Sequence, residues 1–282
     1  DRYEGPRRKY ILAWIGIILG FAPMIAPMIG AVLLRVAGWR AVFLLQAALG
    51  AGVLSASWRF YRETAAERIP GRLLTLMGRY VHLARNGRYA MSVTAMGLIL
   101  GPFYGFIAFA PIVYLQIYGL SNRSFSLLFG LNALTGMSGA FVCMRVMRRL
   151  PDTVLLTICL LGCAAGGAGI LLWGGWHYAA FAAAMCLMTF FCGMSRPLSN
   201  NLILEQVRHD IGSASSFIVF YQFLVGALCM RLVSLPWEAP IRVFGLIALL
   251  MPVVVLAIWP LLLHRLGMPP PVGISVEPAD AV

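Results

Sequence analysis

Polar side chains are rare in the apolar stretches of this 282-residue chain, and the few present mark where chemistry could occur. Asn132 and Gln222 lie well inside such stretches, and a buried amide needs a hydrogen-bond partner. Phe103 and Tyr104 adjoin a proline, and aromatic rings bind apolar or cationic ligands by stacking and cation–π contacts. With Tyr221, these residues form the candidate binding site for a small amphipathic or aromatic molecule. Interhelical hydrogen bonds and packing against helices or lipid are the alternatives.

Residues that could support catalysis are scattered. The six cysteines all fall in apolar stretches and the four histidines lie far apart in the sequence. No nucleophile–base pair, phosphate-binding glycine loop or cluster of metal-ligating residues is recognisable. We therefore expect no enzyme, no cofactor and no metal site, and we interpret the cysteines as small buried apolar residues.

The composition is typical of a membrane protein. Hydrophobic residues make up 61% of the chain, charged residues 11%, and the mean hydropathy is +0.85. These values exclude a disordered chain, a disulfide-rich secreted domain and an ordinary soluble enzyme. In an apolar chain a net charge of +12 indicates Arg-rich cytoplasmic loops, so nucleic acid is not an expected partner.

The elements that must position these residues are membrane-spanning helices of about 20 apolar residues each. No acidic residue falls within the apolar runs, as the cost of an acid at the bilayer centre requires. The sequence therefore predicts an all-α membrane protein with eight transmembrane helices. The runs are 11–34, 40–58, 89–112, 125–147, 153–173, 177–195, 211–234 and 241–263.

Most of the 22 Lys and Arg residues fall on one side of the predicted membrane. The positive-inside rule places that side, and both termini, in the cytoplasm. Arg196 belongs to a cytoplasmic loop in this scheme, and Asn200 and Asn201 are interpreted as caps or loop residues. Within 89–112, Gly97, Gly101 and Gly105 repeat every four residues, which predicts a close helix–helix contact.

The predicted organisation has four parts. Residues 1–58 hold two transmembrane helices, and 59–88 form a cytoplasmic linker. Apolar and basic residues recur in the linker at helical spacing, which favours an amphipathic helix at the lipid headgroups over a solvated linker. Residues 89–267 form a six-helix half, and 268–282 form a Pro-rich disordered tail.

Three motifs in order resemble one family of transporters. Ala26-Pro27-Met28-Ile29-Gly30 precedes Gly38-Trp39-Arg40, Tyr118-Gly119-Leu120-Ser121 precedes Asn132, and Gly212-Ser213-Ala214-Ser215 precedes Gln222. The chain thereby resembles the Bcr/CflA (bicyclomycin/chloramphenicol resistance) drug:proton antiporters of the major facilitator superfamily. The resemblance implies helices five to twelve of a twelve-helix fold, with helices one to four absent. The motif usually has Gly before its second proline, where Ala26 stands here.

The resemblance also implies roles. Gly20, Pro23, Ala26, Pro27 and Gly30 would seal the two halves of the transporter against proton leak and flex during transport. A conformational latch would occupy the basic loop with Arg145, Arg148, Arg149 and Asp152, which a topology anchor explains nearly as well. The proton-coupling acid would lie upstream of Asp1, so we expect residues 1–282 not to pump alone.

The functional expectation is a multidrug efflux transporter of the bacterial inner membrane that exports small amphipathic drugs in exchange for protons. A metabolite transporter of the same superfamily is the first alternative. A non-transporting membrane receptor or assembly subunit is the second. A transporter predicts that the amides and aromatic rings converge on one hydrated cavity, whereas a receptor or scaffold would pack them dry.

Overall fold

The computed structural model describes three continuous segments, residues 36–61, 83–207 and 211–266. It also describes Arg7, Tyr10, Ile11, Trp14, Ile29, Gly30, Leu33, Gly78, Tyr80 and Val81. The prolines of the first predicted span, Pro23 and Pro27, lie outside the described residues, as do Gly20 and Ala26. Most of the predicted linker and the whole of the predicted tail lie outside them too.

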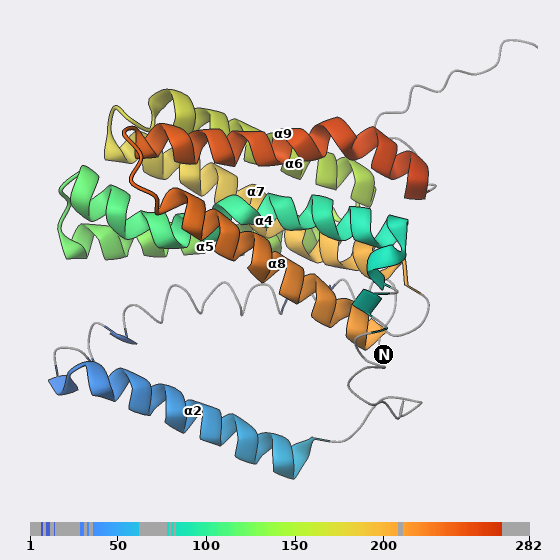
Figure 1. Ribbon diagram of the computed structural model, residues 1–282, viewed down its shortest axis with the longest axis horizontal. Helices are drawn as coiled ribbons and strands as arrows, with labels where there is room; N and C mark the ends of the chain where they lie inside the picture. Colours follow the sequence, from blue (N-terminus) through green and yellow to red (C-terminus); the bar gives the residue numbers. More distant parts are fainter. Residues whose placement is uncertain are drawn as a thin grey trace, which may run out of the picture.

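All regular structure among the described residues is helical (Figure 1). The elements in chain order are α2 (Trp39–Phe60), α4 (Gly87–Pro111), the π-helix η1 (Ile112–Ile117), α5 (Asn122–Val146), α6 (Asp152–Trp173), α7 (Tyr178–Leu204), α8 (Ile211–Val233) and α9 (Pro240–Leu266). Helices α4 to α9 pack side by side in one bundle, and α2 runs apart from it (Figure 1).

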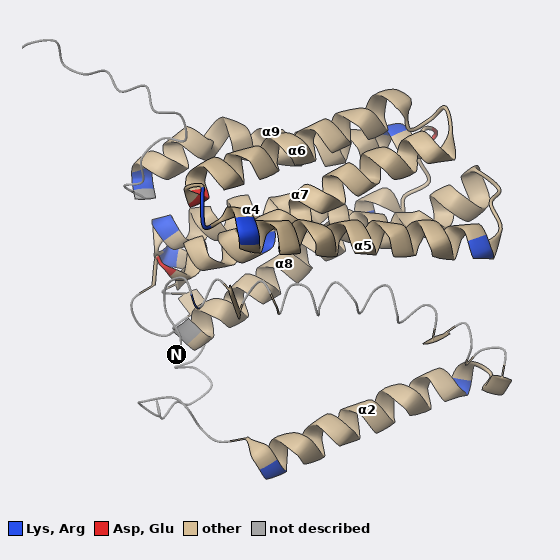
Figure 2. Ribbon diagram, turned by 180° about the vertical axis from the view of Figure 1, so that it is seen from behind, with Lys and Arg blue, Asp and Glu red and all other residues tan. Residues whose placement is uncertain are grey.

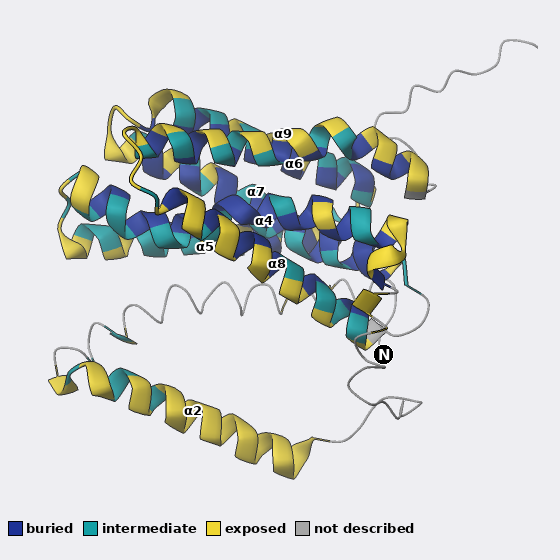
Figure 3. Ribbon diagram, in the orientation of Figure 1, coloured by how far each residue is buried: buried dark blue, intermediate teal, exposed yellow. Residues whose placement is uncertain are grey.

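Seven described helices are long and apolar enough to cross a membrane, counting α4 and η1 as one. They confirm seven of the eight predicted runs. Figure 2 shows most of the charged ribbon near the helix ends, as membrane insertion requires. In Figure 3 the buried residues gather in the bundle, whereas α2 has no buried residue. The apolar side chains of α2 therefore need lipid or other helices around them.

The sixth predicted run ends too early. Helix α7 continues nine residues beyond 195, to Leu204, so the assignment of Arg196 to a loop is wrong. Asn200 and Asn201 are likewise helical rather than caps or loop residues. Pro197 lies inside the helix and does not end it.

Glycines bring pairs of helices into backbone contact. A Cβ atom on Gly139 of α5 would lie 2.0 Å from the carbonyl oxygen of Phe190 on α7, and one on Gly193 would lie 2.0 Å from that of Gly136. Between α6 and α9, a Cβ on Gly167 would lie 2.5 Å from the backbone of Ala248. Small residues are typical of such membrane contacts, where dispersion and shape replace the hydrophobic driving force.

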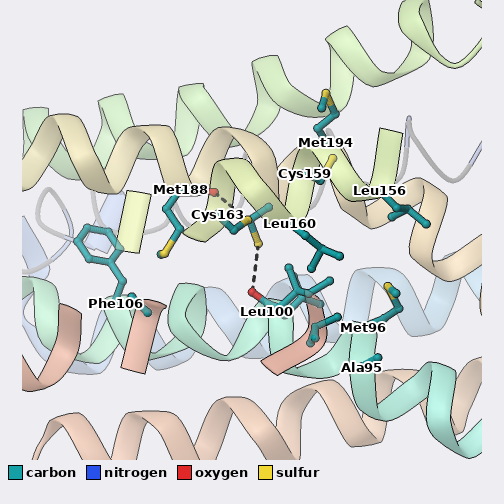
Figure 4. Packing of buried hydrophobic residues seen from close by; sticks show 14 of the residues in the cluster. Ala95, Met96, Leu100, Phe106, Leu156, Cys159, Leu160, Cys163, Met188 and Met194 are labelled. Carbon is teal, nitrogen blue, oxygen red and sulfur yellow. Dashed lines mark hydrogen bonds between the residues drawn. The ribbon is translucent and has the colours of Figure 1, made fainter. Parts of the chain in front are cut away.

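The glycines of α4 meet the side chains of its neighbours, which confirms the predicted close contact. Gly97 faces the ring of Tyr221 on α8, and Gly101 faces Cys229 on α8 and Met251 on α9. Five of the six cysteines are buried and the sixth is half-buried, and all six are free thiols, as their interpretation as small apolar residues requires. Figure 4 shows Cys163 in this core, where its thiol donates to the carbonyl of Met188 at 3.7 Å.

Candidate functional site

A narrow cavity of about 40 Å³ lies between α4, α5 and α7 and is partly open to the outside. Its walls differ in chemistry. Aromatic rings from α4 and α5 line it together with small residues from α5 and α7. Asn132, Thr189 and Arg196 are the polar side chains that reach it.

The aromatic wall is built from stacked rings. Phe106 of α4 and Phe129 of α5 stack with centroids 5.8 Å apart and an interplanar angle of 15°. Phe103 lies one turn earlier on α4, at the same cavity. Phe106 is 1% exposed and also contacts Tyr114 and Phe181 edge-on or tilted, so a continuous aromatic core holds the wall in place. Rigid rings of this kind suit flat apolar ligands.

Asn132 places a half-satisfied amide at the cavity. Its side chain is 3% exposed, and its Oδ1 accepts a hydrogen bond from the Thr189 hydroxyl across the α5–α7 contact at 3.0 Å. Its Nδ2 is fully buried, makes no hydrogen bond of ordinary geometry among the described residues and lies near the Cys186 thiol. An unsatisfied buried donor is costly, so this amide is the group in the wall that most needs a ligand or water.

Arg196 brings a positive charge into the bundle. It lies eight residues before the end of α7, about 12 Å along the helix axis. One guanidinium nitrogen donates to the Tyr104 hydroxyl at 3.2 Å, and the guanidinium carbon lies 5.9 Å from the centroid of Phe103. A cation at this depth is expensive unless it faces a cavity or a partner, and in this chain it faces a cavity.

No acidic side chain pairs with Arg196 within the described segments. The acids there are Asp152 at the start of α6, Glu205 at the end of α7 and Glu238 before α9. Each of them lies at a helix end or in a connection. The phenol of Tyr104 is neutral, so it accepts a hydrogen bond without cancelling the charge.

The structure brings three of the five predicted binding residues together. Phe103 and Asn132 line the cavity, and Tyr104 borders it through Arg196. Tyr221 and Gln222 do not line it. The Tyr221 ring packs against Gly97, and the Gln222 amide donates to Asn200 Oδ1 at 3.3 Å between α8 and α7. Their role in binding substrate stays a prediction.

Two further predicted groups are described only in part. Within the proline motif, Gly30 is helical and open space surrounds its Cβ position. In the predicted latch, Arg145 ends α5 with its guanidinium carbon 4.2 Å from the centroid of the Phe141 ring, and Arg148 and Arg149 lie in the turn before Asp152. The latch role of the basic segment and the sealing role of the proline motif stay predictions, because these contacts test neither.

Sequence reasoning missed Arg196 and Thr189. The positive-inside rule assigns an arginine near a helix end to the adjacent loop. The pattern of apolar residues around Arg196 did not contradict this assignment. A usable signal did exist. Ser195, Ser199 and Asn201 surround Arg196 in the sequence and are 1%, 5% and 0% exposed. A polar stretch that continues an apolar run can be the interior face of a longer helix.

The Asn132–Thr189 hydrogen bond leads to a stability prediction. Thr189→Val should lower the free energy of unfolding by about 1–3 kcal/mol, because it leaves the buried Asn132 carbonyl without a donor. Adding Asn132→Leu to that variant should restore much of the loss, since both partners are then apolar. Thermal unfolding in detergent of the two single variants and the double variant measures this coupling. Additive effects would show that the bond contributes nothing.

Similarity to known proteins covers most of the chain. A family model described as Major Facilitator Superfamily matches residues 1–230. The chain is 25% identical over 246 residues to a bicyclomycin resistance protein homolog from Haemophilus influenzae, and 27% identical over 244 residues to a chloramphenicol resistance protein from Pseudomonas aeruginosa. It is 25% identical over 270 residues to multidrug resistance protein D from Escherichia coli.

These alignments cover 83%, 83% and 92% of this chain. They cover 60%, 57% and 66% of the three relatives. The chain therefore spans about three fifths of the length of the curated relatives it matches.

Proposed function

The chain belongs to the major facilitator superfamily, and from this premise we propose that it is part of a transporter that exports small amphipathic or aromatic drugs in exchange for protons. It is a helical, multi-pass membrane protein. We place it in the bacterial inner membrane with both termini in the cytoplasm, because its basic residues gather on one side.

The cavity between α4, α5 and α7 is the observation that carries this proposal. A stacked pair of phenylalanines faces it, together with one amide, one hydroxyl and one cation. Pockets for drug-sized ligands have this apolar lining with a few polar groups. A carrier of sugars would need many more hydroxyl-binding groups than these. The names of the relatives, which refer to resistance to bicyclomycin, chloramphenicol and multiple drugs, support the same substrate class.

Proton exchange rests on the family resemblance. The acids of the described helices lie at helix ends and connections, so none of them is a group that titrates at mid-membrane. The proline motif (Gly20, Pro23, Ala26, Pro27 and Gly30) is proposed to seal the carrier, and the basic segment from Arg145 to Asp152 to latch it, while the substrate site alternates between the two sides.

Growth and dye-efflux assays test the proposal. The complete gene, expressed in a bacterial host that lacks its own drug pumps, should raise the inhibitory concentration of at least one aromatic drug. Export should stop when a protonophore collapses the proton gradient. Phe103→Ala should reduce export, because it removes a ring from the cavity wall. Phe220→Ala is the matched control, since that ring is 60% exposed and outside the cavity.

Two outcomes would overturn the proposal. Uptake of a sugar, amino acid or nucleoside without drug export would identify a metabolite carrier of the same superfamily. No transport of any compound, together with stable association with another membrane protein, would identify a receptor or assembly subunit.

A further inference from the structure

We propose that this cavity selects aromatic molecules that carry a negatively charged group, and that Arg196 and Asn132 bind that group together. The inference rests on the proposed export function and narrows its substrate class. Three independent observations, on charge, on hydrogen-bonding groups and on shape, support it.

The charge of the cavity is positive. Arg196 is the one charged residue that lines it, and no acid within the described segments pairs with the guanidinium. A guanidinium inside a membrane bundle is stabilised by an anion far more than by the neutral phenol it now contacts. Because opposite charges attract strongly at low dielectric, a ligand anion would bind here and a ligand cation would be repelled.

The polar atoms of the cavity that still have hydrogen-bonding capacity to spare are donors. The Asn132 Nδ2 makes no hydrogen bond of ordinary geometry although its side chain is 97% buried, and the Arg196 guanidinium has one hydrogen-bond partner in the described part of the chain. The Asn132 carbonyl is already bonded to Thr189. A ligand that pairs with these donors must therefore supply hydrogen-bond acceptors. A carboxylate has two oxygens with about four lone-pair sites.

The shape of the cavity supplies a place for a ring beside that anion. Phe103 lies next to the guanidinium, and the stacked Phe106 and Phe129 continue the aromatic wall. One face of Phe103 already lies toward a cation, so it is not free to bind a cationic drug. The walls therefore fit an aryl group with its anion directed toward Arg196.

The test compares two ligands of the same shape. Biphenyl-4-carboxylate and its neutral amide, biphenyl-4-carboxamide, are titrated into the purified full chain in detergent by calorimetry. The carboxylate should bind about ten- to a hundredfold more tightly, as expected for hydrogen bonds to a charged group. Arg196→Gln should abolish this preference while the amide still binds. Arg196→Lys should keep part of it, because the charge remains and the forked geometry is lost.

Arg242→Gln is the matched control. It removes the same charge at an exposed site near the start of α9, so it should leave the preference intact. Asn132→Leu should weaken carboxylate binding and leave the amide less affected, since the amide brings one carbonyl acceptor. If the Arg196→Gln variant binds the amide as the unchanged chain does, this also shows that the variant is folded.

Equal affinities for the two ligands, or a preference that survives Arg196→Gln, would overturn the inference. Export assays with the same two compounds separate this failure from that of the proposed function. Export of the amide without preferential carboxylate binding would contradict the selectivity for anions and leave the proposed export function intact. A preference for the carboxylate that depends on Arg196, without export of either compound, would contradict the transport function and support the binding site.

Discussion

Gly193→Ala is expected to lower the stability of the bundle by about 3 kcal/mol or more, the upper end of the range for overpacked sites. The new methyl group would lie 2.0 Å from the carbonyl oxygen of Gly136, and a backbone atom cannot move aside as a flexible side chain does. Helices α5 and α7 must separate instead. Gly139→Ala should act in the same way through the Phe190 carbonyl. Thermal unfolding in detergent measures both effects.

Gly105→Ala is the control for this prediction. Its Cβ would lie 3.6–3.7 Å from Cys229, Phe244 and Val233, which is ordinary van der Waals contact. Alanine is the better helix former by about 0.5–1 kcal/mol, so this variant should be neutral or slightly stabilised. Gly193→Ala and Gly105→Ala variants of equal stability would show that α5 and α7 do not approach as closely as described.

Asn132→Asp is expected to make carboxylate binding strongly dependent on pH. The side chain keeps its shape, and its first oxygen can still accept from Thr189. The second oxygen replaces the amide donor and becomes negative when the carboxyl ionises. At an effective dielectric of about 20 and a separation of about 4 Å, which a direct contact implies, two like charges repel by about 4 kcal/mol.

The sign of the pH dependence follows from that repulsion. Below the pKa of the new carboxyl, the group is neutral and biphenyl-4-carboxylate should bind almost as it does to the unchanged chain. As pH rises through that pKa, affinity should fall, by about a thousandfold for 4 kcal/mol. The neutral amide is the internal control and should show no such fall. Carboxylate affinity independent of pH would show that the ligand group does not bind beside residue 132.

The fold was largely predictable from the sequence, because each transmembrane helix needs a run of apolar residues whose length the bilayer sets. The α4 glycines also predicted their contacts, since small residues at a four-residue spacing share a helix face. The end of α7 was not predictable in this way. Polar residues such as Ser199 and Asn201 look like a loop in the sequence but are buried between helices.

The candidate site was predictable only in part. Asn132 stands alone in an apolar run, which identifies it as an amide that needs a partner. Gln222 has the same signature and instead bonds to Asn200, because the choice between a cavity and a neighbouring helix depends on packing angles that spacing does not set. The pairing of Arg196 with Tyr104 joins residues 92 positions apart, so it emerges only in the folded bundle.

The wall made of Gly136, Gly193, Ala133 and Ala140 has a consequence for how substrate range could change by mutation. Glycine has no side chain to shorten and alanine has one methyl group, so substitutions on this side can scarcely enlarge the binding space and mostly shrink it. New room for bulkier compounds must come from the larger lining side chains, above all Phe103, Phe106 and Phe129. Under the proposed export function, variants that accept larger compounds should therefore accumulate at the aromatic positions of α4 and the first half of α5.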